Sequence, residues 1–280
     1  QLLLPYPQFL GGANNGAVSG TGTISVGTEG YVGSDQYDPG TIRVERRFSR
    51  GNSVLATYTR SRLRDKLNYL NAADGLLEDR ISPNDRPNRF TMAATFALPF
   101  GKGRHFGSNW SGFTEALLGG WSLSGNFEHQ TGFPLIWNTS LYYDPNRNPQ
   151  DLKSNIGHKD GNGIAGLDYP AWDVSGFYIE GGPGRTDPRI QMGNNVRYFP
   201  STLPEVRSHQ LNLFDFGIGK SFGLPRGTAL QIRIEMINAL NYTVLWNPGL
   251  DPRASSGLFG IVNQDRNNPR DIQLGLRFTF

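Results

Sequence analysis

Apolar and polar residues alternate strictly at the end of the chain, in Asp271-Ile-Gln-Leu-Gly-Leu-Arg-Phe-Thr-Phe280. A period of two places one set of side chains on one face of a β-strand and the intervening set on the other. The apolar set here is Ile272, Leu274, Leu276, Phe278 and Phe280. With six earlier segments of the same pattern, the predicted strands are Thr41–Phe48, Ser53–Arg62, Arg89–Leu98, Gly119–Gln130, His209–Lys220, Thr228–Asn238 and Asp271–Phe280.

The length of these strands favours a membrane barrel over a soluble sandwich. They run over 8 to 12 residues, whereas globular strands usually have about 5–6 and tilted membrane-spanning strands need about 9–11. Helical signals are scarce, and the best helical candidate, Leu67–Leu77, is short and contains Gly75. The pattern therefore predicts an all-β protein, an antiparallel transmembrane β-barrel segment of about seven long strands.

The connections between the predicted strands differ in length at the two ends. Arg50–Asn52 and Gly223–Gly227 are short and Pro99–Leu118 is intermediate, while the other three are long and polar: Leu63–Asn88, Thr131–Ser208 and Ala239–Arg270. Bacterial outer-membrane barrels have short periplasmic turns and long extracellular loops. If Phe280 lies at the periplasmic end, every long loop is extracellular. We expect 1–280 to form part of one barrel, in which 131–208 is a large extracellular loop with enough aromatic residues to fold locally.

Composition alone indicates a soluble protein and not a membrane barrel, because only 37% of the 280 residues are hydrophobic and the mean hydropathy is −0.45. Those values are typical of a soluble protein, and no apolar run approaches the roughly 18 residues that a membrane helix needs. The absence of cysteine excludes disulfides, zinc-thiolate sites and thiol nucleophiles. The net charge of +3 is spread along the chain, so nucleic-acid binding is not indicated. Placing the polarity in loops and inward faces reconciles this composition with a barrel.

Motifs for enzymatic or cofactor chemistry are weak. Gly161-Asn-Gly-Ile-Ala-Gly166 matches a dinucleotide-binding fingerprint, but a polar loop replaces the strand and helix that the motif requires, so a turn explains it better. The four histidines, His105, His129, His158 and His209, form no i,i+4 pair. No nucleophile elbow is present, and no acid, base and nucleophile can be assembled. We therefore expect no cofactor, and an enzyme is the least favoured class.

Two sets of polar residues remain as candidate sites. Asp160, Asn162 and Asp168 are candidate oxygen ligands for calcium in the large loop, although their spacing departs from the EF-hand loop and an Asn-Gly turn explains the same residues. The polar strand faces are predicted to be lumen-facing. They form either a charged lumen that a solute or plug contacts, or an ion-pair ladder across strands, and we favour the ladder. The residues concerned are Arg43, Glu45, Arg47, Gln231, Arg233, Glu235 and Arg277.

Several stretches, in order along most of the chain, resemble the C-terminal part of the barrel of TonB-dependent outer-membrane receptors. The resemblance is closest to the Oar-like group, whose members often carry a carboxypeptidase-regulatory-like domain. The stretches are Leu3-Leu-Pro-Tyr-Pro-Gln-Phe9, Val44-Glu-Arg-Arg-Phe48, Ala56-Thr-Tyr-Thr-Arg-Ser61, Asp85-Arg-Pro-Asn-Arg-Phe90, Leu98-Pro-Phe-Gly-Lys-Gly103, Leu118-Gly-Gly-Trp-Ser-Leu-Ser-Gly125, Gln130-Thr-Gly-Phe-Pro134, Glu235-Met-Ile-Asn-Ala-Leu-Asn241 and the final Phe280.

The resemblance implies energised uptake of a large or scarce solute across the outer membrane. It also implies that the terminal set from Ile272 to Phe280 is similar to the signal read by the barrel-assembly machinery. The expected partners are outer-membrane lipid, that machinery, and a plug and further barrel strands outside these residues, with a TonB-type energiser by resemblance only. An odd strand number with two open edges predicts the C-terminal piece of a longer barrel, or pairing with other chains.

Two other classes compete with transport. The first is a structural or adhesive surface protein in which the barrel only displays loops. The second is a soluble secreted β-protein, either a carbohydrate binder or a filament subunit whose open edges pair between chains. The low mean hydropathy favours the soluble class, while strand length and the sorting of loops by end oppose it.

Overall fold

The protein is described by a computed structural model that covers residues 33–48, 51–71, 74–137, 141, 143–177, 197–252 and 257–280. The stretch Leu3–Phe9, which contributed to the family resemblance, lies outside these residues. None of the helices within the described ranges is both long enough and apolar enough to cross a membrane.

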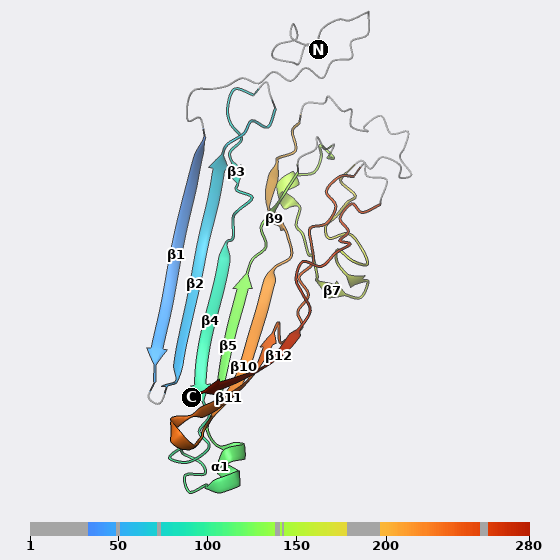
Figure 1. The fold of residues 1–280 in the computed structure, drawn as a ribbon. Helices are drawn as coiled ribbons and strands as arrows, with labels where there is room; N and C mark the ends of the chain where they lie inside the picture. The colour runs from blue at the N-terminus through green and yellow to red at the C-terminus, as the bar shows by residue number, and fades with distance from the viewer. Residues whose placement is uncertain are drawn as a thin grey trace, which may run out of the picture.

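Seven long strands form one antiparallel sheet in which each strand pairs with the next long strand along the chain (Figure 1). Each contains 9 to 14 residues: β1 (Ser34–Arg47), β2 (Ser53–Lys66), β4 (Asn88–Ala97), β5 (Trp121–Gln130), β10 (Leu211–Gly223), β11 (Ala229–Ile237) and β12 (Asp271–Thr279). All seven lie at predicted positions, which confirms the all-β antiparallel class.

Two strands are longer than the apolar pattern predicts. β1 starts at Ser34 and β2 ends at Lys66, because the ladder continues through polar pairs such as Asp38 with Arg62 and Gln36 with Arg64. Backbone hydrogen bonds sustain these pairs without an apolar face, so alternation does not show them. β1 therefore begins seven residues before the predicted start at Thr41, and this hairpin extends past the apolar part of the sheet.

The register of the sheet keeps the two sets of side chains apart on opposite faces. One row across five strands contains Val44, Ala56, Met92, Phe127 and Phe214. The adjacent row contains Glu45, Leu55, Ala93, Asn126 and Asp215. Rows of the first kind form what we call the apolar face, and rows of the second kind form the polar face. The alternation seen in single strands thus extends to most rows of the sheet.

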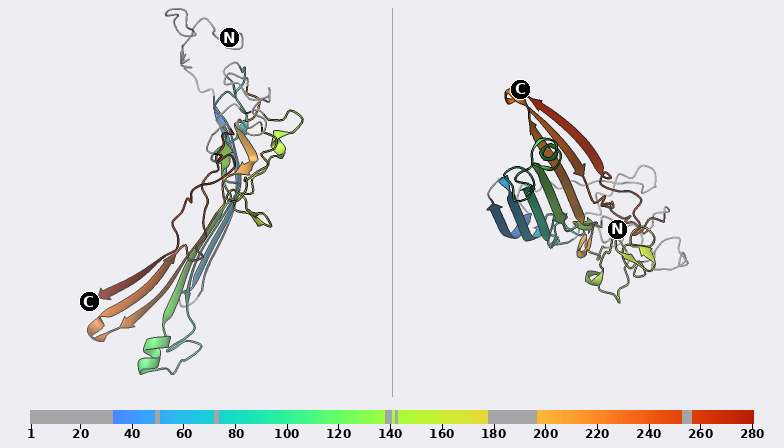
Figure 2. Two further views of the ribbon diagram at one scale, coloured as in Figure 1. Left: turned by 90° about the vertical axis from the view of Figure 1, so that its right-hand side faces the viewer. Right: turned by 90° about the horizontal axis from the view of Figure 1, so that it is seen from below.

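The sheet is curved but not closed into a barrel within the described residues (Figure 2). β1 and β12 are its edges and each has a single long-strand neighbour. Every apolar residue of the terminal set is exposed, from 55% at Phe278 to 98% at Phe280. Because no other part of the described chain covers these five side chains, lipid is the environment that suits them.

The ends of the sheet differ as the connection lengths predict. Residues 48–52, 98–120 and 224–228 join strands at the end where the chain terminates, and the three long connections lie at the other end (Figure 1). Leu67–Leu77, the best helical candidate in the sequence, contains no helix among its described residues. The connection Pro99–Leu118 contains α1 (Gly112–Leu118), which the sequence pattern did not predict. Seven residues are too few to show a helical period, and contacts with the sheet hold α1 in place.

The buried core lies in the long connections and not in the sheet. We call the described residues of 67–87, 131–210 and 238–270 the loop domain. Its short elements are β3 (Arg80–Ile81), β6 (Pro134–Ile136), β7 (Lys159–Asp160), β8 (Gly163–Ile164), β9 (Thr202–Arg207) and the 3-10 helix Pro149–Asp151. β6 pairs with β9, and β7 pairs with β8. The sheet therefore carries a folded body at its long-loop end.

Candidate functional site

An aromatic cluster forms the centre of the loop domain. Trp137 is completely buried, and its ring centroid lies 5.4 Å from that of Trp172, 5.7 Å from Phe177 and 5.5 Å from Phe199. Phe259, from the third long connection, packs 5.0 Å from Phe177. Large rings in edge-to-face contact supply most of the apolar area that such a small body can bury. The expectation that the large loop folds locally is confirmed, with the addition that another loop contributes to its core.

Asp85 and Arg207 join two of the long connections to the end of β2. Arg207 Nη2 donates to Asp85 Oδ2 over 2.8 Å; the Asp85 side chain is almost fully buried and that of Arg207 is 15% exposed. The other carboxylate oxygen, Oδ1, accepts the backbone N–H of Leu63 in β2 at 2.7 Å. Arg207 also donates to the carbonyl oxygen of Gly132 at 3.1 Å. One carboxylate thus fixes the loop domain to the sheet through charge-assisted hydrogen bonds.

A second buried ion pair reinforces this attachment. Arg80 Nε donates to Asp65 Oδ1 at 2.7 Å, and Arg80 Nη1 donates to Ser201 Oγ at 2.8 Å. Asp65 belongs to β2, Arg80 to β3, and Ser201 to the segment before β9. Glu78 accepts hydrogen bonds from both the backbone N–H and the hydroxyl of Ser201. The long-loop end of β2 is therefore the platform on which the loop domain is mounted.

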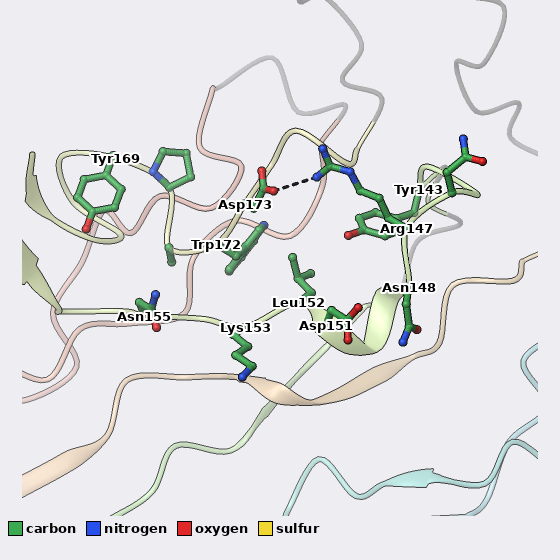
Figure 3. A pocket seen from close by; sticks show the side chains of 13 residues that line it. Tyr143, Arg147, Asn148, Asp151, Leu152, Lys153, Asn155, Tyr169, Trp172 and Asp173 are labelled. Atoms are coloured by element: carbon green, nitrogen blue, oxygen red, sulfur yellow. Dashed lines mark hydrogen bonds and ion pairs between the residues drawn. The ribbon is translucent and has the colours of Figure 1, made fainter.

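A cavity of about 760 Å³ opens on the surface of the loop domain. Its lining includes Arg147, Lys153, Asp151 and Asp173, so cations and carboxylates balance. The amides of Asn146, Asn148 and Asn155 and the ring of Tyr169 also line it. Figure 3 shows these side chains around the cavity and the ion pair of Arg147 with Asp173 at one side. The lining suits a polar ligand without a large net charge.

Charge in the cavity is held by short local hydrogen bonds. Ser175 donates to Asp173 Oδ1 from its hydroxyl at 2.5 Å and from its backbone N–H at 2.9 Å. These bonds, followed by the Arg147 guanidinium, hold the pKa of Asp173 below its ordinary value. Burial raises the pKa of Tyr143, which keeps this phenol neutral beside the charged pair. At neutral pH the cavity therefore presents an ionised carboxylate, a guanidinium and a neutral phenol.

A neighbouring cavity of about 520 Å³ is lined in part by His209, Tyr242 and Gly157. Nδ1 of His209 accepts the backbone N–H of Leu245 at 2.9 Å, and Nε2 lies 3.0 Å from the hydroxyl of Tyr242. Since Nδ1 accepts, the proton of the neutral ring is on Nε2, which donates to Tyr242. Burial lowers the pKa of His209, because a charged imidazolium would lose solvation there.

Acidification is expected to destabilise the loop domain around His209. In the unfolded chain this imidazole takes up a proton near pH 6.5, while the lowered pKa keeps it neutral to lower pH in the fold. The unfolded state therefore binds more protons in this window, so stability that is complete above about pH 6.5 is lost as the pH falls toward the folded pKa. Hydrogen exchange at the Leu245 amide, corrected for its intrinsic rate, measures the loss. His209→Gln, which does not titrate, should abolish this dependence, and an unchanged dependence would contradict the assignment.

The candidate calcium ligands are used by the loop's own hydrogen bonds. Asp160 accepts the N–H of Asn162 at 2.8 Å and the hydroxyl of Tyr169 at 2.8 Å, and these two bonds lower its pKa. Asp168 accepts the N–H of Ile164 at 2.7 Å. Gly161 and Asn162 form the turn of the β7–β8 hairpin, which confirms the interpretation of the glycine-rich motif as a turn. Nowhere in the described ranges do three His, Asp or Glu residues gather as a metal site would require.

All seven residues predicted to face the lumen lie on the polar face, in register with polar rows of the neighbouring strands. Arg43, Glu45 and Arg47 are in β1, and Gln231 pairs with Arg277 between β11 and β12. Their ion pairs run along single strands: Glu45 with both Arg43 and Arg47, and Arg233 with Glu235. For Glu45 and Arg233, neighbours on the same strand therefore balance the charge that a ladder across strands was expected to balance.

The residues that hold the loop domain together were missed by reasoning from the sequence. Asp85 lies within the stretch that carried the family resemblance, but nothing in the pattern marks it as buried or paired with Arg207. Arg147 and Asp173 are 26 positions apart and come together only through the fold of the large loop. The one local signal was the density of aromatic residues in 131–208, which indicated a folded body without indicating its attachments.

Comparison with known proteins supports the architecture at the level of the family. Searches of curated proteins and of solved structures each returned no significant match. The family model described as an outer membrane beta barrel domain matches residues 1–273, nearly the entire chain. That family is found in the bacterial outer membrane, which agrees with long two-faced strands and an exposed apolar face. The chain belongs to the outer membrane beta barrel domain family.

Proposed function

We propose that the chain is the C-terminal barrel segment of a TonB-dependent receptor-like transporter for a large or scarce solute. The observation that carries the proposal is the folded loop domain with its cavity of about 760 Å³, mounted at one end of a membrane-length sheet. A barrel that served only as an anchor would not need a buried aromatic core and paired charges in its loops. The long loops are extracellular in this proposal, where solute is first met.

The open sheet agrees with this proposal. In lipid the backbone groups along β1 and β12 need partners, so further strands must pair with these edges when the barrel is closed. The polar faces then line the interior, where Arg43, Glu45 and Arg233 meet water and a plug. The cavity lining, with balanced charges, three amides and the half-buried Tyr169, favours a polar solute that is neutral or zwitterionic.

The proposal is tested by measuring which solutes whole cells remove from a defined mixture. Mass spectrometry of the medium compares the parent strain, a strain lacking the gene, and a strain lacking the energising TonB protein. We expect the same solute to remain in the medium of both deletion strains. The double variant Arg147→Ala with Asp173→Ala should slow the removal of that solute while its surface expression stays normal. If the gene deletion instead weakens attachment to surfaces, while the TonB deletion leaves both uptake and attachment unchanged, the protein is adhesive and transport is refuted.

A further inference from the structure

In β10 a charged residue, Lys220, interrupts the apolar face of the sheet near the short-turn end. In β10 the apolar face runs through Phe216, Ile218, Lys220 and Phe222. Lys220 is in register with Trp121 of β5 and with Ile232 of β11, and Ile232 is in register with Leu276 of β12. A cation here stands in a row whose other members are apolar. Such a charge at a lipid-facing position is costly unless something covers it.

The cover is α1. Lys220 is only 5% exposed, and its ammonium donates to the carbonyl oxygens of Glu115 at 3.0 Å and Ala116 at 2.5 Å. The ring centroids of Trp121 and Phe222 lie 5.6 Å and 4.9 Å from Nζ. The lysine therefore meets the negative end of a helix and two aromatic faces, both favourable surroundings for a cation.

Side chains of the sheet donate hydrogen bonds to the carbonyl groups in the last turn of α1, where water would do so in an exposed helix. The last carbonyl groups of a helix have no partner within the helix. Here the indole N–H of Trp121 donates to Leu117 O at 2.9 Å, and the ammonium of Lys220 donates to Ala116 O and to Glu115 O, which also accepts the backbone N–H of Gly119. Both donors project from the apolar face. Where lipid excludes water, such groups need protein partners, and the structure provides them at this position.

The side of α1 that faces away from the sheet is apolar and exposed. Phe113 is 80% exposed, and Leu117, one helical turn later, and Leu118 are also exposed. The only carboxylate of α1, that of Glu115, is turned toward the chain and accepts the backbone N–H of Lys102 at 2.8 Å. Nearby, Lys102 is exposed and Arg104 is half-buried. Bulky apolar residues beside basic ones are typical of a segment at a phospholipid interface.

We propose that α1 is an interfacial membrane anchor that inserts Phe113 and Leu117 among phospholipid chains at the short-turn end of the sheet. Lys220 positions it from the row that contains Ile232 and Leu276, so the helix continues the lipid-facing surface without a break. Lys102 and Arg104 meet anionic headgroups. This anchor depends on the membrane location of the family and not on which solute, if any, is transported.

Site-directed spin labelling tests the anchor, because residues 1–280 contain no cysteine. Single cysteines at Phe113, Leu117, Leu76 and Leu274 are labelled in the whole protein, folded into vesicles of phosphatidylethanolamine and phosphatidylglycerol. Leu274 reports the apolar face, and Leu76, 84% exposed in the loop domain, reports water. The measurement is the accessibility of each nitroxide to oxygen relative to a water-soluble nickel chelate.

We expect the oxygen-to-nickel ratio at 113 and 117 to be several times that at 76 and close to that at 274. A ratio at 113 and 117 equal to that at 76 overturns the anchor. Lys220→Met tests the positioning separately, with heat-modifiable gel mobility as the check on folding. It should increase the motional freedom of the label at 113 while the label at 274 stays unchanged. An unaltered spectrum at 113 overturns the role of Lys220.

Discussion

Replacing Asp85 with alanine is expected to detach the loop domain from the sheet and destabilise it by about 3–5 kcal/mol, the usual effect of breaking a buried ion pair. The substitution removes the acceptor for the backbone N–H of Leu63 as well as the partner of Arg207. The guanidinium of Arg207 is then buried without a counter-charge, and the positive charges of Arg86 and Arg266 lie on the same side of the domain. Hydrogen exchange of amides in β9, measured in lipid bilayers, reports the change.

Asp79→Ala is the matched control for this experiment. Asp79 also pairs with an arginine, Arg64 at 2.7 Å, but its side chain is 48% exposed. An exposed ion pair contributes about 0–1 kcal/mol, so β9 exchange should remain close to that of the parent protein. Equal effects of the two substitutions would show that burial of the Asp85 pair has no special role in holding the loop domain.

Trp137→Ala is expected to destabilise the loop domain by about 3–5 kcal/mol, the range for truncating a buried large aromatic residue. Trp137 contacts Trp172, Phe177 and Phe199, and its removal leaves a cavity that rigid neighbouring rings cannot fill. The strands should remain in the membrane, because Trp137 is not part of the sheet. Pulse proteolysis of vesicle-bound protein in increasing urea measures the shift in the midpoint for cleavage within 141–177.

Trp246→Ala controls for loss of an indole from the same domain. This side chain is 48% exposed, so we expect a change within about 1 kcal/mol, typical of surface positions. A midpoint shift as large as that of Trp137→Ala would mean that the aromatic cluster is not the core of the domain. Heat-modifiable mobility of both variants should stay normal, since neither change touches a strand.

The sheet could be predicted from the sequence because lipid imposes a simple rule on its strands. Every second residue must be apolar, and the terminal set from Ile272 to Phe280 follows that rule without exception. The polar extensions of β1 and β2 escaped the rule because their backbone pairing needs no particular side chain. The sorting of loops by length was equally visible, since it depends only on spacing between strands.

The candidate site was only partly predictable because its parts are distant in sequence. The aromatic content of 131–208 indicated a folded body, but a tryptophan near the end of a membrane strand, such as Trp137, suits an interfacial girdle as well as ordinary packing. Only the fold shows that it is the centre of the core. Asp85 and Arg207 are 122 positions apart, and no local period marks either of them. The short helix α1 was hidden because seven residues contain less than two full turns of pattern.

The separation between an exposed sheet and a core enclosed by its loops has a consequence for how such a protein can diversify. Insertion into the bilayer depends on the strand residues, whereas the cavity at Arg147 and Asp173 is built on Trp137, Asp85 and their partners. Mutations that reshape the cavity therefore leave the membrane-spanning part untouched. The residues that line the cavity can therefore vary in evolution while the sheet stays the same, provided that the ion pairs of Asp85 and Asp65 are kept.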